Sequence, residues 1–182
     1  MKYTFCFLLL SAFWANAQTD NVTVSSPDGK LAVNVSLENG KPSYNISLNG
    51  KTFLNKSPLG LKTNVGDFTE GLVLKQNTSL RKIENTYELP NIKQSKVNYV
   101  ANEGVISFSK SNVDAIDVIF RVSNNDVAFR YKVYPQKRAF SCVVNEEASG
   151  FVLPKGTTTF LSAQSKAMVG FARTMPSYEI PY

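Results

Sequence analysis

The chain has 182 residues, with 20 basic and 14 acidic side chains and a formal net charge of +6. The basic residues are spread along the sequence rather than gathered in a run, which argues against a nucleic-acid partner. The chain contains no histidine, which excludes the usual Ser-His-Asp triad and most zinc sites, so any catalysis would rest on carboxylates.

The first 17 residues predict a secretory signal peptide. Lys2 supplies a charged start, residues 5–14 are mainly apolar, and the Ala-Asn-Ala triplet at 15–17 offers a small-residue cleavage site. The apolar stretch is too short for a membrane span, and no later segment resembles one. We therefore expect an exported chain without a membrane span, which begins at Gln18 and forms one domain over residues 18–182.

A single cysteine is left once the signal is removed. Cys6 lies within the signal, so Cys142 has no intramolecular disulfide partner. Residues 140–144 form an apolar, strand-like run, and no histidine can activate the thiol. We expect Cys142 to be a buried structural thiol.

Alternation of apolar and polar residues, with a period of two, dominates the start of the mature chain. Residues 31–37 and 44–48 each show it, and the Gly-Lys-Pro triplet at 40–42 separates them. Asn49-Gly50 follows, the dipeptide most typical of a two-residue hairpin turn, and predicts a further strand over residues 51–54. The pattern indicates consecutive half-buried strands.

A second hairpin is predicted where the apolar runs 116–122 and 127–133 flank the polar turn 123–126. In the second run the apolar residues alternate with Arg130 and Lys132, as in an antiparallel sheet with one wet face. No segment predicts an amphipathic helix. Further short strands are expected at residues 97–100, 105–108, 140–144 and 157–161. Together these strands indicate an all-β protein, an antiparallel sandwich of two sheets.

Few residues suggest chemistry. Glu146-Glu147 is the visible carboxylate pair, but neighbours on a strand point to opposite faces, so we assign no catalytic residue here. The only tryptophan, Trp14, lies in the signal. Seven tyrosines remain as possible sugar platforms, and for Tyr44, Tyr99 and Tyr131 packing in the core explains the strand positions equally well. The sequence alone leaves both interpretations open.

Four blocks of sequence, in order, resemble the N-terminal domain of glycoside hydrolase family 97. They are SPDGKL at residues 26–31, SPLGLKTNVGDF at 57–68, FRVSNNDVAFRYKVY at 120–134 and NEEASGFVLPKGTTTF at 145–160. The resemblance implies a large two-sheet super-sandwich that packs against a downstream (β/α)8 barrel. It also implies periplasmic enzymes that cleave α-glucosides or α-galactosides, with the catalytic carboxylates on the barrel. The likeness is greatest to the α-galactosidase-like, retaining branch.

The resemblance also implies a calcium ion near the active site, held largely by barrel glutamates and assisted by one glutamate from the end of the N-terminal domain. Glu179 occupies that place in this sequence. A single carboxylate cannot hold calcium, which takes six to eight oxygen ligands. Glu179 is therefore expected to be one ligand of an incomplete site, and the alternative is a plain exposed glutamate.

Three functions follow from these patterns. The first is a non-catalytic support domain of an exported α-glycosidase, whose partner would be the catalytic barrel and whose abrupt stop at Tyr182 would be a cut before that barrel. It predicts an apolar patch for docking. The second is a free-standing carbohydrate-binding module, and the third is a structural or adhesive sandwich unrelated to sugars.

Overall fold

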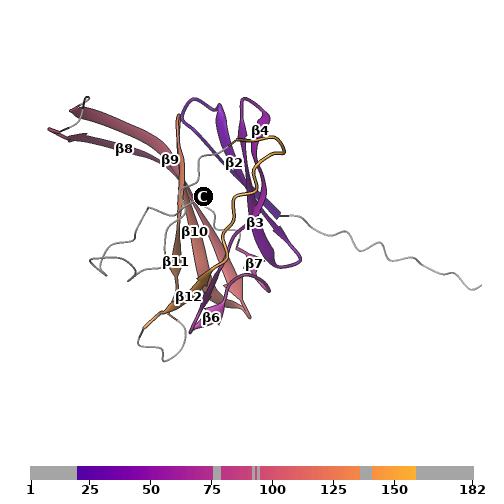
Figure 1. The fold of residues 1–182 in the computed structure, drawn as a ribbon. Coiled ribbons are helices and arrows are strands. Elements are labelled where there is room, and N and C mark those ends of the chain that lie inside the picture. Colours follow the sequence, from indigo (N-terminus) through magenta and orange to yellow (C-terminus); the bar gives the residue numbers. More distant parts are fainter. Residues whose placement is uncertain (1–19, 76–78, 92, 94, 136–140, 159–182) are drawn as a thin grey trace, which may run out of the picture.

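The computed structural model describes residues 20–75, 79–91, 93, 95–135 and 141–158. Every regular element in these ranges is a strand, which confirms the predicted all-β class for the described residues. The search for a helix long and apolar enough to cross a membrane found none among them. The strands form two large antiparallel sheets and one small one (Figure 1).

The first sheet has the strand order β1-β2-β3-β4. Its members are β1 (Asp20–Ser25), β2 (Leu31–Glu38), β3 (Lys41–Leu48) and β4 (Lys51–Pro58). The alternation predicted for β2 is confirmed, because its residues alternate between buried and half-buried positions as far as Leu37. Asn49 and Gly50 have φ angles of 50° and 75°, which is the conformation of a type I′ turn and confirms the predicted hairpin.

The second sheet has the order β11-β10-β9-β7, and β8 pairs with β9 beyond the end of β7. Its members are β7 (Val73–Leu74), β8 (Ser79–Glu88), β9 (Lys96–Lys110), β10 (Val113–Ser123) and β11 (Val127–Val133). The β10–β11 hairpin is the one that the sequence predicts. The small sheet, of order β12-β5-β6, consists of β5 (Leu61–Thr63), β6 (Gly66–Asp67) and β12 (Val144–Glu147).

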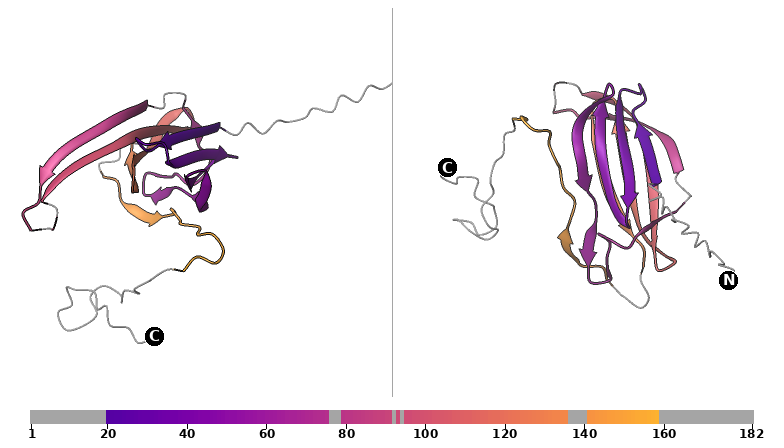
Figure 2. Two further views of the ribbon diagram at one scale, coloured as in Figure 1. Left: turned by 90° about the horizontal axis from the view of Figure 1, so that it is seen from above. Right: turned by 90° about the vertical axis from the view of Figure 1, so that its right-hand side faces the viewer.

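The core lies between the two large sheets (Figure 2). Val33 and Tyr44 from the first sheet meet Ile106 and Phe120 from the second, and each of these side chains is at most 1% exposed. Gly104 on β9 has no room for a side chain, because a Cβ there would overlap Val24 of β1. The predicted sandwich is therefore confirmed, with β1 packed closely on β9.

The strand boundaries differ from the prediction in three places. Residues 97–100 and 105–108 belong to one long strand, β9. The strand expected at 140–144 begins only at Val144, as β12. Thr157 and Thr158 lie outside any strand, and the rest of the strand expected at 157–161 is outside the described residues. β1 and β8 were not predicted, since β8 is polar along most of its length.

A two-stranded arm projects from the sandwich. β9 pairs with β10 from Ala101 onwards, so among the described strands residues 96–100 of β9 have only β8 as a neighbour. Figures 1 and 2 show β8 and this part of β9 extending together beyond the other strands and curving away from them. An isolated two-stranded ribbon is marginal in water, so the arm needs either good cross-strand pairs or a partner.

Candidate docking surface

Three of the four sequence blocks meet at one hydroxyl group. The backbone N–H of Gly60 donates to the Tyr131 hydroxyl oxygen at 2.8 Å, and the same oxygen lies 2.7 Å from Ser149 Oγ. Gly60 also accepts a hydrogen bond from the N–H of Ala148. Burial raises the pKa of Tyr131, so the group stays a neutral phenol at neutral pH. Tyr131 is therefore a structural link between the second, third and fourth blocks.

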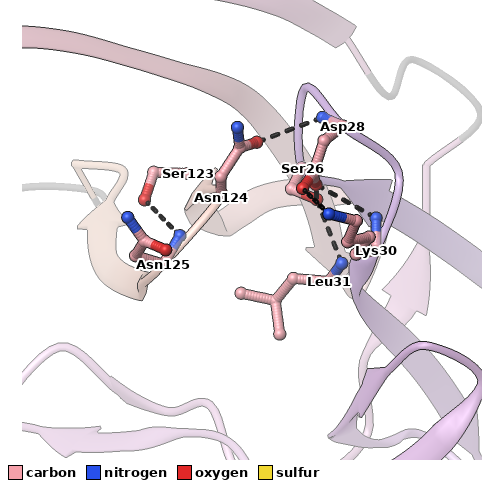
Figure 3. A network of polar contacts seen from close by, with 7 residues as sticks. All are labelled: Ser26, Asp28, Lys30, Leu31, Ser123, Asn124 and Asn125. Atoms are coloured by element: carbon pink, nitrogen blue, oxygen red, sulfur yellow. Dashed lines mark hydrogen bonds and ion pairs between the residues drawn. The ribbon is translucent and has the colours of Figure 1, made fainter.

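The first block forms a compact turn that contacts the third (Figure 3). Ser26 Oγ donates to Asp28 Oδ1 at 2.6 Å, and the same carboxylate oxygen accepts from the N–H of Lys30. These bonds, led by the Ser26 hydroxyl, hold the pKa of Asp28 below its usual value. The N–H of Asp28 donates to Asn124 Oδ1 at 3.1 Å, in the turn between β10 and β11. The Ser-Pro-Asp-Gly block thus joins the two sheets at one end of the sandwich.

The fourth block runs along β4 and places one aromatic ring beside the core. The N–H of Gly150 donates to the Pro58 carbonyl at 3.1 Å, and the N–H of Asn55 donates to the Val152 carbonyl at 2.9 Å. The Tyr44 hydroxyl donates to the Gly150 carbonyl at 3.1 Å. The Phe151 ring lies 6.5 Å from the Tyr44 ring, and yet Phe151 is 69% exposed. The segment covers the edge of the sandwich only in part.

An apolar groove of about 510 Å³ opens at this edge, and we call it the inter-sheet groove. Four of its apolar side chains remain more than 40% exposed, namely Leu48, Phe53, Phe151 and Leu153. The turn between β10 and β11 closes one end. The groove is lined by Leu31, Ile46, Leu48, Phe53, Leu54, residues 124–127, Phe151 and Leu153. An exposed apolar surface of this kind marks a contact site in a soluble protein.

A buried ion cluster lies on the opposite, outer face of the second sheet. Glu103 is 1% exposed, and its carboxylate accepts from Arg81 Nη2 and from Arg121 Nε, each at 2.6 Å. The three residues are directly opposite one another on β8, β9 and β10. Burial raises the pKa of Glu103, but the bonds from the two guanidinium groups outweigh it and leave the pKa below its usual value. The cluster holds the base of the arm together.

The same outer face continues onto the arm as an apolar surface. Tyr87 is opposite Val97, and Ile83 is opposite Ala101. Between these pairs Tyr99 is opposite Asn85, the one polar residue in this row. Tyr87 is 45% exposed, while Ile83, Val97 and Tyr99 are half-buried. We call Ile83, Tyr87, Val97 and Tyr99 the apolar face of the arm. Among the described strands, residues 96–100 of β9 pair only with β8.

The other face of the arm is polar. Its cross-strand pairs are Glu88 with Lys96, Thr86 with Asn98 and Glu84 with Val100. Alternation between an apolar and a charged face is the pattern of a ribbon with one covered and one wet side. The arm thus has one mainly apolar and one polar face.

The two glutamates of the carboxylate pair have different surroundings. Glu146 and Glu147 are neighbours on β12. Glu146 Oε2 accepts from Lys62 Nζ at 2.9 Å, whereas Glu147 lines a separate pocket of about 350 Å³ with Tyr44 and Phe129. The two carboxylates therefore do not face each other across a common site.

The expectation for Cys142 is wrong, because the thiol is exposed. The strand β12 begins only at Val144, and the preceding residues bond to a turn of the small sheet instead of entering the core. The N–H of Val143 donates to Asn64 Oδ1 at 2.7 Å, and Asn64 Nδ2 donates to the Ser141 carbonyl at 3.2 Å. These bonds hold Cys142 at the rim of the domain.

The three tyrosines at alternating strand positions have different surroundings. Tyr44 is 1% exposed and belongs to the core, so it offers no ring to a sugar. Tyr131 is half-buried and bonded to Gly60, while Tyr99 lies on the apolar face of the arm.

Glu179, the expected calcium ligand, is outside the described residues. Within the described ranges no group of three or more His, Cys, Asp or Glu side chains could hold a metal ion.

Comparison with known proteins gives one consistent result. The family model "Glycosyl-hydrolase 97 N-terminal" matches residues 24–182. A probable retaining α-galactosidase of Streptomyces bingchenggensis (strain BCW-1) is 29% identical over 171 residues, which are 92% of this chain and 26% of that protein.

Two solved structures extend the likeness. The crystal structure of a β-arabinopyranosidase superposes with a TM-score of 0.78 and 49% identity, over 87% of this chain and 25% of the other. A family 97 glycoside hydrolase from Pseudoalteromonas sp. strain K8, in complex with panose, superposes with a TM-score of 0.67 and 26% identity, over 74% and 20%. The chain therefore spans about a quarter of the length of these relatives.

Proposed function

The chain belongs to glycoside hydrolase family 97 as its N-terminal domain, and on that premise we propose that it is the non-catalytic support domain of an exported, periplasmic α-glycosidase. Its partner is the catalytic barrel of the same polypeptide, which binds the carbohydrate substrate, and the domain helps to complete the active site. The predicted signal peptide at residues 1–17 supports the exported location.

The observation that carries this proposal is the apolar face of the arm, on which Tyr87 is 45% exposed. It is contiguous with the outer face of the second sheet, where Ala101 and Ile119 are already shielded by their neighbours. A neighbouring domain that lay against this curved surface (Figure 2) would bury Tyr87 and Tyr99. Because the chain corresponds to about a quarter of its relatives, the remainder of such a protein supplies a partner of sufficient size.

For the substrate we propose an α-galactoside or a sugar of the same ring configuration, with α-glucosides as the alternative. The likeness to a probable retaining α-galactosidase and to a β-arabinopyranosidase supports the first choice. In the L series, a β-arabinopyranoside has the ring configuration of an α-D-galactopyranoside without its C6 hydroxymethyl group. The panose complex of the Pseudoalteromonas relative supports the alternative.

The docking proposal predicts that Tyr99→Lys weakens the full polypeptide that includes the catalytic domain. A buried interface aromatic contributes on the order of 1–2 kcal/mol, so we expect the melting temperature of this domain to fall by about 3–6 °C. Activity on p-nitrophenyl α-D-galactopyranoside should fall with it. Differential scanning calorimetry and a rate assay measure both effects.

Thr86→Lys, on the polar face of the same arm, is the matched control. It removes only the exposed hydrogen bond to Asn98 and should change both quantities far less than Tyr99→Lys does. In the separately expressed chain, which ends at Tyr182, the two variants should melt alike. If the two variants had the same melting temperature and activity in the full polypeptide, that result would contradict docking through the arm. Heat of binding from the separate chain with α-linked oligosaccharides would instead favour the sugar-binding module, for which the half-exposed ring of Tyr87 is the available platform.

We also propose that Glu179 donates one carboxylate to a calcium ion whose remaining ligands come from the catalytic domain. One carboxylate provides too few oxygen ligands for calcium, so calcium binding requires both domains to be present. In the full polypeptide, Glu179→Gln should raise the calcium concentration for half-maximal activity by about tenfold, whereas Glu146→Gln should not change it. An unchanged calcium dependence of the Glu179 variant, measured by titration of the chelated enzyme, would refute the assignment.

A further inference from the structure

The outer face of the second sheet holds more positive charge than its buried carboxylate balances. Arg81 and Arg121 share the single carboxylate of Glu103, and their side chains remain 63% and 38% exposed. Arg130 on β11 is exposed and has no hydrogen bond or ion pair with any described residue. Three guanidinium groups therefore accompany one carboxylate, which leaves two positive charges in this group unmatched.

Arg121 and Arg130 line a common hollow of about 370 Å³. Arg130 is opposite Ile119 and Arg121 is opposite Ala128, so the two arginines are diagonal neighbours on one face of the sheet. Ile119, which is 6% exposed, lies between them and lines the same hollow. Arg121 donates to Glu103 through Nε, and its two Nη groups have no acceptor among the described residues. Both arginines can therefore donate to a further carboxylate.

We propose that this hollow receives a carboxylate side chain of the catalytic domain, held between Arg121 and Arg130. This contact presupposes the docking function proposed above. The two arginines lie on the same outer face as the apolar face of the arm, which β9 carries past Glu103. A domain that lay along the arm would also remove this part of the sheet from water. Arg130 would then be buried as an unpaired charge, which is strongly unfavourable unless the partner supplies an anion.

The composition of this surface favours a protein partner over a free anion. Tyrosine and arginine are among the residues most enriched at the energetic centre of protein interfaces. Here the tyrosines of the arm continue directly into the arginine cluster, because Tyr99 and Glu103 lie on the same face of β9. Tyr87 is 45% exposed and the Arg81 side chain is 63% exposed, so both can contact a partner. A free anion would use the arginines alone and leave the tyrosines in water.

Arg130→Glu should change the melting temperature with opposite signs in two proteins. In the full polypeptide that includes the catalytic domain, the introduced carboxylate faces the carboxylate of the partner, so the melting temperature of this domain should fall by about 3–6 °C. In the separate chain, which ends at Tyr182, the same change places a carboxylate beside Arg121 and removes a like charge, so the temperature should not fall. Differential scanning calorimetry measures both. Lys51→Glu, which reverses an exposed charge on β4 of the first sheet, is the matched control and should act alike in both proteins.

Three other outcomes overturn the assignment. A fall of equal size in the separate chain would show that Arg130 acts within its own domain. If Arg130→Glu left the full polypeptide unchanged while Tyr99→Lys still lowered its melting temperature, docking through the arm would stand without this contact; if neither variant had an effect, docking itself would fail. Stabilisation of the separate chain by added phosphate, abolished by Arg130→Glu, would identify a site for a free anion instead of the catalytic domain.

Discussion

Tyr44→Ala is expected to lower the free energy of unfolding by about 4 kcal/mol, more than any other substitution proposed for this domain. The Tyr44 ring is 1% exposed and packs 5.6 Å from both Phe120 and Phe129. Its removal leaves a cavity between the sheets and also deprives the Gly150 carbonyl of its donor. Urea unfolding followed by fluorescence or circular dichroism measures the change.

Tyr44→Phe separates the two contributions. It keeps the ring and removes only the hydroxyl, so the expected loss is about 1 kcal/mol. Losses of similar size for the alanine and phenylalanine variants would contradict the view that ring packing dominates. The comparison also tests whether the segment at Gly150 depends on this bond for its place beside β4.

The same residue gives a pH dependence of defined sign. Burial, with a smaller contribution from Tyr131, raises the pKa of Tyr44 to about 12. A tyrosine in the unfolded chain has a pKa of about 10. Below that pH its hydroxyl is neutral, which favours the folded state. This contribution, about 2–3 kcal/mol, is lost as the pH rises from about 10 to about 12. Tyr44→Phe should lose less stability across this range than the unmodified domain.

Glu103→Gln is expected to cost about 2–3 kcal/mol. The change leaves Arg81 and Arg121 with a neutral acceptor in place of a carboxylate that is 1% exposed. Breaking a fully buried ion pair costs about 3–5 kcal/mol, and the partly exposed guanidinium groups recover some of this from water. Glu146→Gln, which breaks the exposed pair with Lys62, should cost less than about 1 kcal/mol. Urea unfolding of the two variants measures both losses.

The acid range provides a second check on the cluster. The pKa of Glu103 is lowered in the folded domain, so its carboxylate adds stability above the ordinary glutamate pKa of about 4.3. That contribution is lost as the pH falls below this value towards the folded pKa. The difference in stability between the unmodified domain and Glu103→Gln should therefore shrink in this range. A difference that stays constant down to about pH 2 would contradict a charged Glu103.

Local sequence patterns determined much of the fold. The alternation in residues 31–37 and 127–133 specified half-buried strands, and Asn49-Gly50 specified a hairpin turn, because each depends only on neighbours along the chain. The order of the four blocks was enough to predict the family. The exposure of Cys142 was not predictable in this way, since bonds from Asn64, which is 77 residues from Ser141 and 79 from Val143, hold its neighbours at the rim.

The middle of β9 shows what only the tertiary structure decided. Glu103-Gly104 interrupts an apolar pattern, and the sequence therefore predicted two short strands. In the fold Gly104 lies under Val24, where a side chain would overlap, and Glu103 is neutralised by arginines from the strands on either side. These arginines are 22 and 18 positions away along the chain. A charge and a glycine that would break an isolated strand are stable here because distant side chains fill the space and balance the charge.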